Sequence, residues 1–339
     1  MNGFKELSAM LLGGSIGDAV GAPFKYRDVA SIADFYPSGL VDKYCAYFSH
    51  QGGQISSNSQ MTLFTLEGIT NALKSVDPSK IDNFDPFIKI AYSNWLLTQG
   101  HDNQFCNPSE SALVRDTKLC SVRQPSQTCV DALSAMHPDI GHLSPQNAAK
   151  GCGALTRMSP IGMLGHRLSW PTTKTFRLAE NCAFLTHNDP VTASACGAYA
   201  VLVQYLCDGL CVEDSVSAIM RDFGTLSYHQ DAMRPLELAR KLALGVIYPE
   251  YAFHSLTNEN TATSSLALAV YTTINCESFE KAMYMAIAHN GNSPAVSSIV
   301  GTLWVASKGI EGISREFIET NELGDYTFKL AADLVSLTE

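Results

Sequence analysis

Two short runs of small residues with side-chain oxygens are the strongest candidates for ligand binding in this sequence. One is Ser56–Met61 (SSNSQM) and the other is Asn290–Ala295 (NGNSPA), and each opens an apolar segment with helical spacing. The first turn of a helix leaves backbone N–H groups free, so such segments bind polar ligands and anions. Neither run contains Asp or Glu. Binding would depend on hydroxyl, amide and backbone groups, and the alternative is that these residues only cap their helices.

A third candidate segment is rich in glycine. It contains Gly151, Cys152 and Gly153 and leads to Arg157. Glycine lets a backbone approach a ligand or another helix closely, so this segment is a candidate for contact with a bound molecule.

A few isolated side chains are candidates for acid–base chemistry, because their surroundings can tune their pKa values. Each also has a structural alternative. A histidine after an apolar helix is often a satisfied core residue, and an aspartate before a proline often caps a helix. An aspartate among close-packed glycines can bond to a neighbouring helix. The four candidates are Asp18, His187, Asp189 and His289.

The composition narrows the class of protein. Only 17% of the residues are charged, below the roughly 25% typical of soluble domains, so most of the chain is expected to be buried. The net charge of −10 and the lack of a basic stripe argue against nucleic-acid binding. Neither a signal peptide nor a membrane span is expected from the hydropathy. The ten cysteines have no CxxC pair and are typical of reduced thiols, which predicts a cytoplasmic protein.

The elements that must position these residues are predicted to be helices. Apolar residues recur with helical spacing along most of the chain, and no alternating strand pattern, fixed repeat or linker is visible. We therefore predict one compact all-α domain covering residues 1–339, with loops at 24–54 and 100–125. Predicted helices cover 6–20, 60–75, a segment after Pro86, 127–136, 144–150, 175–186, 190–208, 211–223, 233–247, 262–274, 278–289, 295–310 and 324–337.

Five segments, taken in order, carry a family resemblance. They are LLGGSIGDAVGAP (11–23), GQISSNSQMTL (53–63), GCGALTRMSPIG (151–162), LTH (185–187) and AHNGNSPAVSSIVGTLWVA (288–306). Together they resemble the ADP-ribosylglycohydrolase family, which includes the dinitrogenase-reductase-activating glycohydrolases and the J1 crystallins. The resemblance implies an all-α bundle whose cleft holds two magnesium ions and which cleaves ADP-ribose from protein side chains.

The resemblance also implies which residues should hold the magnesium. The family's ligands are a Glu after the GAP turn and carboxylates in two Asp-rich segments, and magnesium prefers such oxygen ligands. Five expected carboxylates are absent here, and one of them is replaced by a lysine. We therefore expect that magnesium binding is lost and that no cofactor is held. The matching positions are Lys25, Ser56, Ser57, Asn58, Asn292, Pro294 and Ala295.

Three hypotheses for the function follow from the resemblance. The first is a catalytically inactive protein that binds ADP-ribose, an ADP-ribosylated protein or, in the manner of an immunity protein, an ADP-ribosyltransferase. The second is a metal-independent hydrolase that uses one of the four acid–base candidates. The third is a structural protein like the J1 crystallins. The residues expected to bind the ligand are Lys25, Ser56, Ser57, Asn58, Gly151, Cys152, Gly153, Arg157, His187, Gly291, Asn292 and Ser293.

Overall fold

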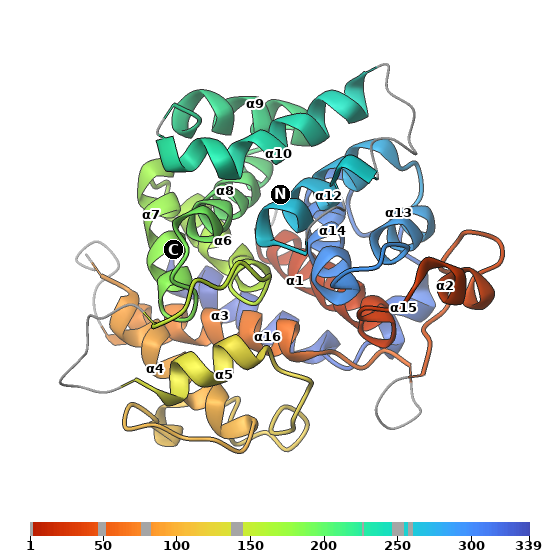
Figure 1. Cartoon of the computed structure of the whole chain (residues 1–339). Coiled ribbons are helices and arrows are strands. Elements are labelled where there is room, and N and C mark those ends of the chain that lie inside the picture. The colour runs from red at the N-terminus through yellow and green to blue at the C-terminus, as the bar shows by residue number, and fades with distance from the viewer. Residues whose placement is uncertain are drawn as a thin grey trace.

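Helices form the secondary structure in every part of the chain that the computed structural model describes, namely residues 3–46, 52–75, 83–136, 145–225, 227–245, 254–256 and 260–339 (Figure 1). The prediction of an all-α fold is confirmed. The helices are α1 (Gly3–Gly21), α2 (Val29–Phe35), α3 (Ser57–Ser75), α4 (Asp85–Thr98), α5 (Gln127–Ser134), α6 (Ser159–Arg167), α7 (Thr172–Phe184), α8 (Pro190–Cys207), α9 (Val212–Phe223), α10 (Ser227–Leu244), α12 (Ala262–Asn275), α13 (Phe279–Ile287), α14 (Ser293–Lys308), α15 (Arg315–Thr320) and α16 (Gly324–Leu337), with short 3₁₀ turns at Ala22–Phe24, Pro108–Glu110 and Leu155–Arg157.

Helix α1 packs along α14, so two helices far apart in the sequence lie side by side (Figure 1). Their backbones touch because both helices carry glycine at the crossing. A Cβ atom on Gly17 would lie 1.9 Å from the carbonyl oxygen of Ser297, and one on Gly301 would lie 2.0 Å from that of Gly13. Side chains cannot occupy that space. This contact brings the end of α1, which Lys25 follows, beside the 290–295 run at the start of α14.

Within the described part of the chain, two helices are long and apolar enough to cross a membrane when judged by length and composition alone. They are Gly3–Phe24, with a mean hydropathy of 1.2, and Pro190–Cys207, with 1.3. Of their most apolar windows, 89% and 78% respectively is buried inside the molecule. Core helices pass the same test, so we assign both to the hydrophobic core.

One predicted helix is wrong. The described part of 144–150, which is residues 145–150, is not helical. The Asn147 side chain accepts hydrogen bonds from the backbone N–H groups of Ala149 (3.1 Å) and Asn188 (3.2 Å), and its amide donates to the carbonyl of Thr186 (3.0 Å). Such side-chain bonds compete with helix formation and fix this segment as a loop.

Three short helices were missed by the sequence analysis. Helix α2 lies inside the predicted loop 24–54 and is capped by the Asp28 side chain, which accepts from the Ser31 N–H at 2.9 Å. Helix α6 has Pro160 in its first turn, and α15 is capped by Ser314. The caps and the proline are the signals that could have located them. Residues 47–51, 144, 246 and 247 of the predicted segments lie outside the described residues.

Candidate functional site

Asp18 connects α1 to the first turn of α3. Its carboxylate has no exposed surface and accepts hydrogen bonds from the backbone N–H groups of Ser56 (2.8 Å) and Ser59 (3.2 Å). The two serine hydroxyls also donate to it, at 2.6 and 2.7 Å. Burial raises the pKa of the Asp18 carboxyl, and these donors act in the opposite direction. Asp18 therefore caps a helix that is distant in sequence, which is a structural task for a carboxylate.

The 56–58 run is largely used by contacts within the protein. Ser56 and Ser57 are buried, and the Ser57 hydroxyl donates to the carbonyl of Gln124 at 3.4 Å. Asn58 is only half-buried. Its amide donates to Asp18 at 3.3 Å, and its side-chain oxygen accepts from the Thr156 hydroxyl at 3.3 Å. Of this run, Asn58 is the residue with a surface that a ligand could reach.

Lys25 follows the end of α1 and faces the same carboxylate. It is half-buried and interacts electrostatically with Asp18 and Cys152. Burial lowers the pKa of the Lys25 ammonium, and Asp18 opposes that shift. Among the described residues no hydrogen-bond acceptor contacts this ammonium, whose nearest aromatic neighbour is the Tyr26 ring at 5.8 Å. An ammonium in this state has capacity for an anionic partner.

The 290–295 run meets the end of α1 directly. The carbonyl of Gly291 accepts from the Tyr26 N–H at 2.9 Å, and the Ser293 hydroxyl lies 3.2 Å from the carbonyl of Phe24. Pro294 and Ala295 are buried. Asn292 precedes α14, yet its side chain makes no capping bond.

The Asn292 side-chain oxygen has no hydrogen-bond partner although it is buried. A buried acceptor without a donor costs about 1–3 kcal/mol, so it is a natural contact for a ligand hydroxyl or amine. Lys25, Asn58, Gly151 and Asn292 are among the half-buried members of the candidate segments. Each of them, or its neighbour in the chain, contacts or interacts with Asp18, Cys152 or the end of α1, and we call these four residues the site mouth.

His289 directly precedes the 290–295 run, and both of its ring nitrogens make hydrogen bonds. Nε2 lies 2.9 Å from the carbonyl of Ala286, and Nδ1 accepts from the Gly291 N–H at 3.1 Å. Because a carbonyl can only accept, Nε2 carries the proton and the ring is neutral. Burial lowers the pKa of His289 to about 4. The ring thus fixes the backbone before α14.

The glycine-rich segment contacts the start of α12. The carbonyl of Lys150 accepts from the Ala262 N–H at 2.8 Å, and the Cys152 thiol contacts the Ser265 hydroxyl at 3.0 Å. Burial raises the pKa of the Cys152 thiol to about 11. A Cβ atom on Gly153 would lie 3.0 Å from the sulfur of Cys129, whereas one on Gly151 would meet no atom within 4 Å. Gly153 is needed for packing, and Gly151 borders open space.

Arg157 and His187 form a separate buried centre. Arg157 has no exposed surface, donates to the Thr186 hydroxyl (2.7 Å) and to the carbonyl of Cys182 (3.0 Å), and stacks on the Tyr92 ring at 4.2 Å. The Thr186 hydroxyl also lies 2.9 Å from Nδ1 of His187. Burial, with Arg157 nearby, lowers the pKa of His187 to about 3.

The arginine and the histidine each keep one unpartnered nitrogen, Nε of Arg157 and Nε2 of His187. No hydrogen bond joins either residue to the site mouth within the described part of the chain. The two residues were predicted to bind the ligand, and the structure places them in the interior.

Asp189 caps α8. One of its oxygens, Oδ2, accepts both the backbone N–H of Thr192 at 2.8 Å and its hydroxyl at 2.7 Å. This is the capping arrangement that the sequence left open as an alternative to catalysis. The structure therefore brings Asp18 and His289 to the site mouth, and it places Asp189 with His187 at the start of α8.

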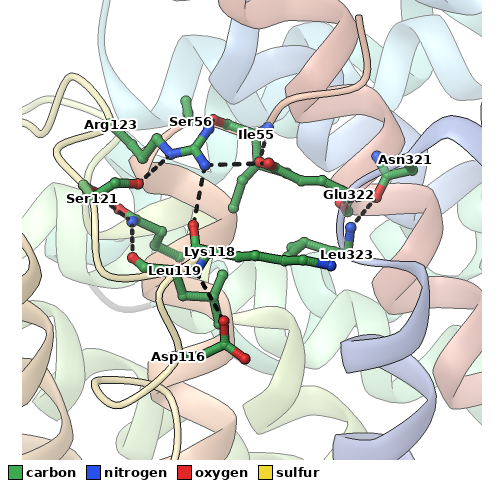
Figure 2. A network of polar contacts seen from close by, with 12 residues as sticks. Ile55, Ser56, Asp116, Lys118, Leu119, Ser121, Arg123, Asn321, Glu322 and Leu323 are labelled. Atoms are coloured by element: carbon green, nitrogen blue, oxygen red, sulfur yellow. Dashed lines mark hydrogen bonds and ion pairs between the residues drawn. The ribbon is translucent and has the colours of Figure 1, made fainter. Parts of the chain in front are cut away.

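The sequence analysis missed a polar network beside the α3 N-terminus (Figure 2). Arg123 pairs with Glu322 at 3.2 Å and donates to the carbonyl of Lys118, and its own carbonyl accepts from the Ser57 N–H at 2.9 Å. Glu322 also accepts from the Ile55 N–H at 2.7 Å. The network ties the 111–124 loop and the C-terminal segment to the start of α3. Residues 199 positions apart form this pair, so no local pattern could reveal it.

The metal-ligand positions implied by the resemblance do not fit a magnesium site. Magnesium needs several oxygen ligands, preferably carboxylates. Here the ammonium of Lys25 interacts electrostatically with the Asp18 carboxylate, the Ser56 hydroxyl donates to that carboxylate, and Pro294 has no side-chain donor atom. Among the described residues no group of three or more His, Cys, Asp or Glu side chains is placed to hold a metal ion. Loss of magnesium stays a prediction that binding experiments must test.

Comparison with known proteins decides the family. The model of the ADP-ribosylglycohydrolase family matches residues 4–339. The chain belongs to the ADP-ribosylglycohydrolase family. A solved chain of an "ADP-ribosylglycohydrolase-related protein complex" superposes with a TM-score of 0.62 over 99% of both chains, at 16% sequence identity. That likeness shows that this family member has the same fold. A search of curated proteins finds no match.

Proposed function

We propose that this member of the family is a catalytically inactive protein that binds ADP-ribose, free or attached to a protein, without magnesium. The observation that carries the proposal is Lys25. Its half-buried ammonium occupies the position expected for a metal-binding Glu and has no hydrogen-bond acceptor among the described residues. A pyrophosphate would supply that acceptor, and charge-assisted bonds to phosphate are strong. The unpaired oxygen of Asn292 would accept from a ribose hydroxyl.

The acid–base candidates favour binding over hydrolysis. A hydrolase needs a group that can exchange a proton with the substrate. Both oxygens of Asp18 accept bonds from the first turn of α3, and both nitrogens of His289 are engaged. Asp189 caps a helix, and His187 has no exposed surface. Three of the four candidates have a structural task and His187 is enclosed, so we do not propose the metal-independent hydrolase.

The decisive experiment is calorimetric titration of ADP-ribose into the protein, once with excess Mg²⁺ and once with EDTA. We expect binding that is unaffected by EDTA. The Lys25→Gln variant should bind about tenfold or more weakly, because a hydrogen bond to a charged group contributes about 1.5–3 kcal/mol. Lys43→Gln removes an exposed lysine and is the matched control.

Three results would contradict the proposal. Absence of binding in both buffers would remove ADP-ribose as the ligand and leave an ADP-ribosyltransferase partner as the hypothesis to test. Binding that requires Mg²⁺ would mean that neutral oxygens hold the ion after all. Release of ADP-ribose from an ADP-ribosyl-arginine substrate would show that the protein is an enzyme.

A further inference from the structure

Tyr26 occupies a backbone position that disfavours tyrosine. Residues 24–27 form a type II turn, in which the Arg27 N–H donates to the carbonyl of Phe24 at 3.0 Å and Lys25 has φ −55° and ψ 116°. The third residue of such a turn needs positive φ, which favours Gly or Asn. Tyr26 has φ 59°. A side chain in this left-handed conformation is strained, and such strain is found most often at functional sites.

The tyrosine ring lies next to Lys25 of the site mouth. Its backbone is fixed there by the hydrogen bond to Gly291, and the Lys25 ammonium lies 5.8 Å from the ring centroid. The side chain also interacts electrostatically with Cys152. Tyr26 is nevertheless 60% exposed. A large part of the ring is therefore free to contact a molecule that binds at Lys25.

The other strained residues make the tyrosine distinctive. Within the described residues, the non-glycine positions with positive φ are Tyr26, Gln124 and Ser169. Gln124 accepts the Ser57 hydroxyl through its carbonyl, so its backbone supports the start of α3. Ser169 lies in an exposed turn after α6. Tyr26 alone of the three presents an aromatic surface.

We propose that Tyr26 is a stacking platform for the base of a nucleotide whose phosphate pairs with Lys25. This rests on the proposed function and adds to it the residue that recognises the base. Aromatic side chains stack on nucleobases, and an adjacent cation neutralises the phosphate. The exposed Tyr26 ring can contact the base of a nucleotide, and the neighbouring Lys25 ammonium, which lacks an acceptor among the described residues, can contact its phosphate.

The experiment titrates AMP, ADP-ribose and ribose 5-phosphate into the wild-type protein and the variants Tyr26→Phe and Tyr26→Asn. Asn tolerates positive φ, so Tyr26→Asn removes the ring and relieves the strain. We expect it to weaken AMP and ADP-ribose binding about fivefold or more and to leave ribose 5-phosphate unchanged, with a Tm no lower than that of the wild type. Tyr26→Phe should keep wild-type affinity. Ser169→Asn relieves similar strain away from the mouth and should change no affinity.

The outcomes separate this inference from the proposed function. Equal affinities of wild type and Tyr26→Asn for ADP-ribose would overturn the role of Tyr26 and leave the proposed function intact. An equal loss for ribose 5-phosphate, or a lower Tm in Tyr26→Asn, would show that the ring supports the turn and would likewise overturn the inference. Wild-type binding of AMP but not ADP-ribose, with loss in Tyr26→Asn, would support the platform and overturn the proposed function. Binding of none of the three probes would overturn both.

Discussion

Replacement of Asp18 should reveal how much stability the start of α3 owes to a carboxylate on α1. Oxygen Oδ2 accepts both backbone N–H groups and the Ser59 hydroxyl, and Oδ1 accepts the Ser56 hydroxyl and the Asn58 amide. Asp18→Ala leaves the two backbone N–H groups buried without acceptors. Each such group costs about 1–3 kcal/mol, so we expect a loss of about 4 kcal/mol in the free energy of unfolding.

Asp18→Asn is the finer test. The single side-chain oxygen of Asn can replace Oδ2 and keep both backbone hydrogen bonds. Its NH₂ group, however, would take the place of Oδ1 and face the Ser56 hydroxyl and the Asn58 amide, which are donors. The loss of one or two side-chain bonds and of the charge at a helix N-terminus predicts a cost of about 2 kcal/mol. The matched control is Asp189→Asn. Oδ2 alone carries that cap, so an amide oxygen can replace it at a cost of under about 1 kcal/mol.

Urea unfolding of the three variants and the wild type, followed by circular dichroism, gives these free energies. The m value should be unchanged, because the same surface is exposed on unfolding. A loss below about 1 kcal/mol in Asp18→Ala would refute the capping argument. Equal losses in Asp18→Asn and Asp189→Asn would show that the number of engaged oxygens does not decide the cost.

Two further predictions concern the helix contact and the buried histidines. Gly17→Ala should destabilise the protein by about 3 kcal/mol, because its Cβ would lie 1.9 Å from the Ser297 carbonyl oxygen. The control is Gly151→Ala, whose Cβ would meet no atom within 4 Å and which should change the free energy of unfolding by less than about 0.5 kcal/mol in the same urea assay. In the folded protein the pKa of His289 is lowered to about 4 from an ordinary value of 6.5. As the pH falls, the unfolded state therefore binds a proton at this histidine before the folded state does. Stability is lost below about pH 6.5, and the loss reaches about 2 kcal/mol at pH 5. Unfolding curves at pH 7.5, 6 and 5 should therefore show a shallower loss in His289→Gln, and an unchanged slope would contradict this assignment.

The helices could be predicted because their signal is local. Apolar spacing located α3, α8, α12 and α14 to within a few residues of their bounds, since a buried helix must repeat its apolar side chains every turn. The short helix α2 was missed because seven residues hold too little pattern. Apolar spacing alone could not show that residues 145–150 are a loop, because the hydrogen bonds of Asn147 that fix the loop reach Thr186 and Asn188, which lie 39 and 41 positions away in the sequence.

The candidate site was predictable only in part. The sequence indicated that Asp18, the 56–58 run and the 290–295 run carry the polar groups, and it left open whether they cap helices or bind a ligand. The structure shows that Asp18 is the cap for α3, although 38 positions separate it from Ser56. The backbone conformation of Tyr26 was missed because the sequence signal for a turn with positive φ is Gly or Asn at its third residue, and here that residue is a tyrosine.

The loss of metal-binding carboxylates and the presence of Lys25 are best understood as one electrostatic change. Asp18 is buried, and further carboxylates beside it would repel it unless cations were bound between them. In this chain the neighbours are Ser56, Ser59 and Asn58, whose O–H and N–H groups donate to Asp18. The Lys25 ammonium supplies the remaining positive charge from within the chain. We therefore infer that groups of the chain itself stabilise the buried carboxylate of Asp18, and that the Lys25 ammonium, which has no hydrogen-bond acceptor among the described residues, keeps the capacity to bind an anion.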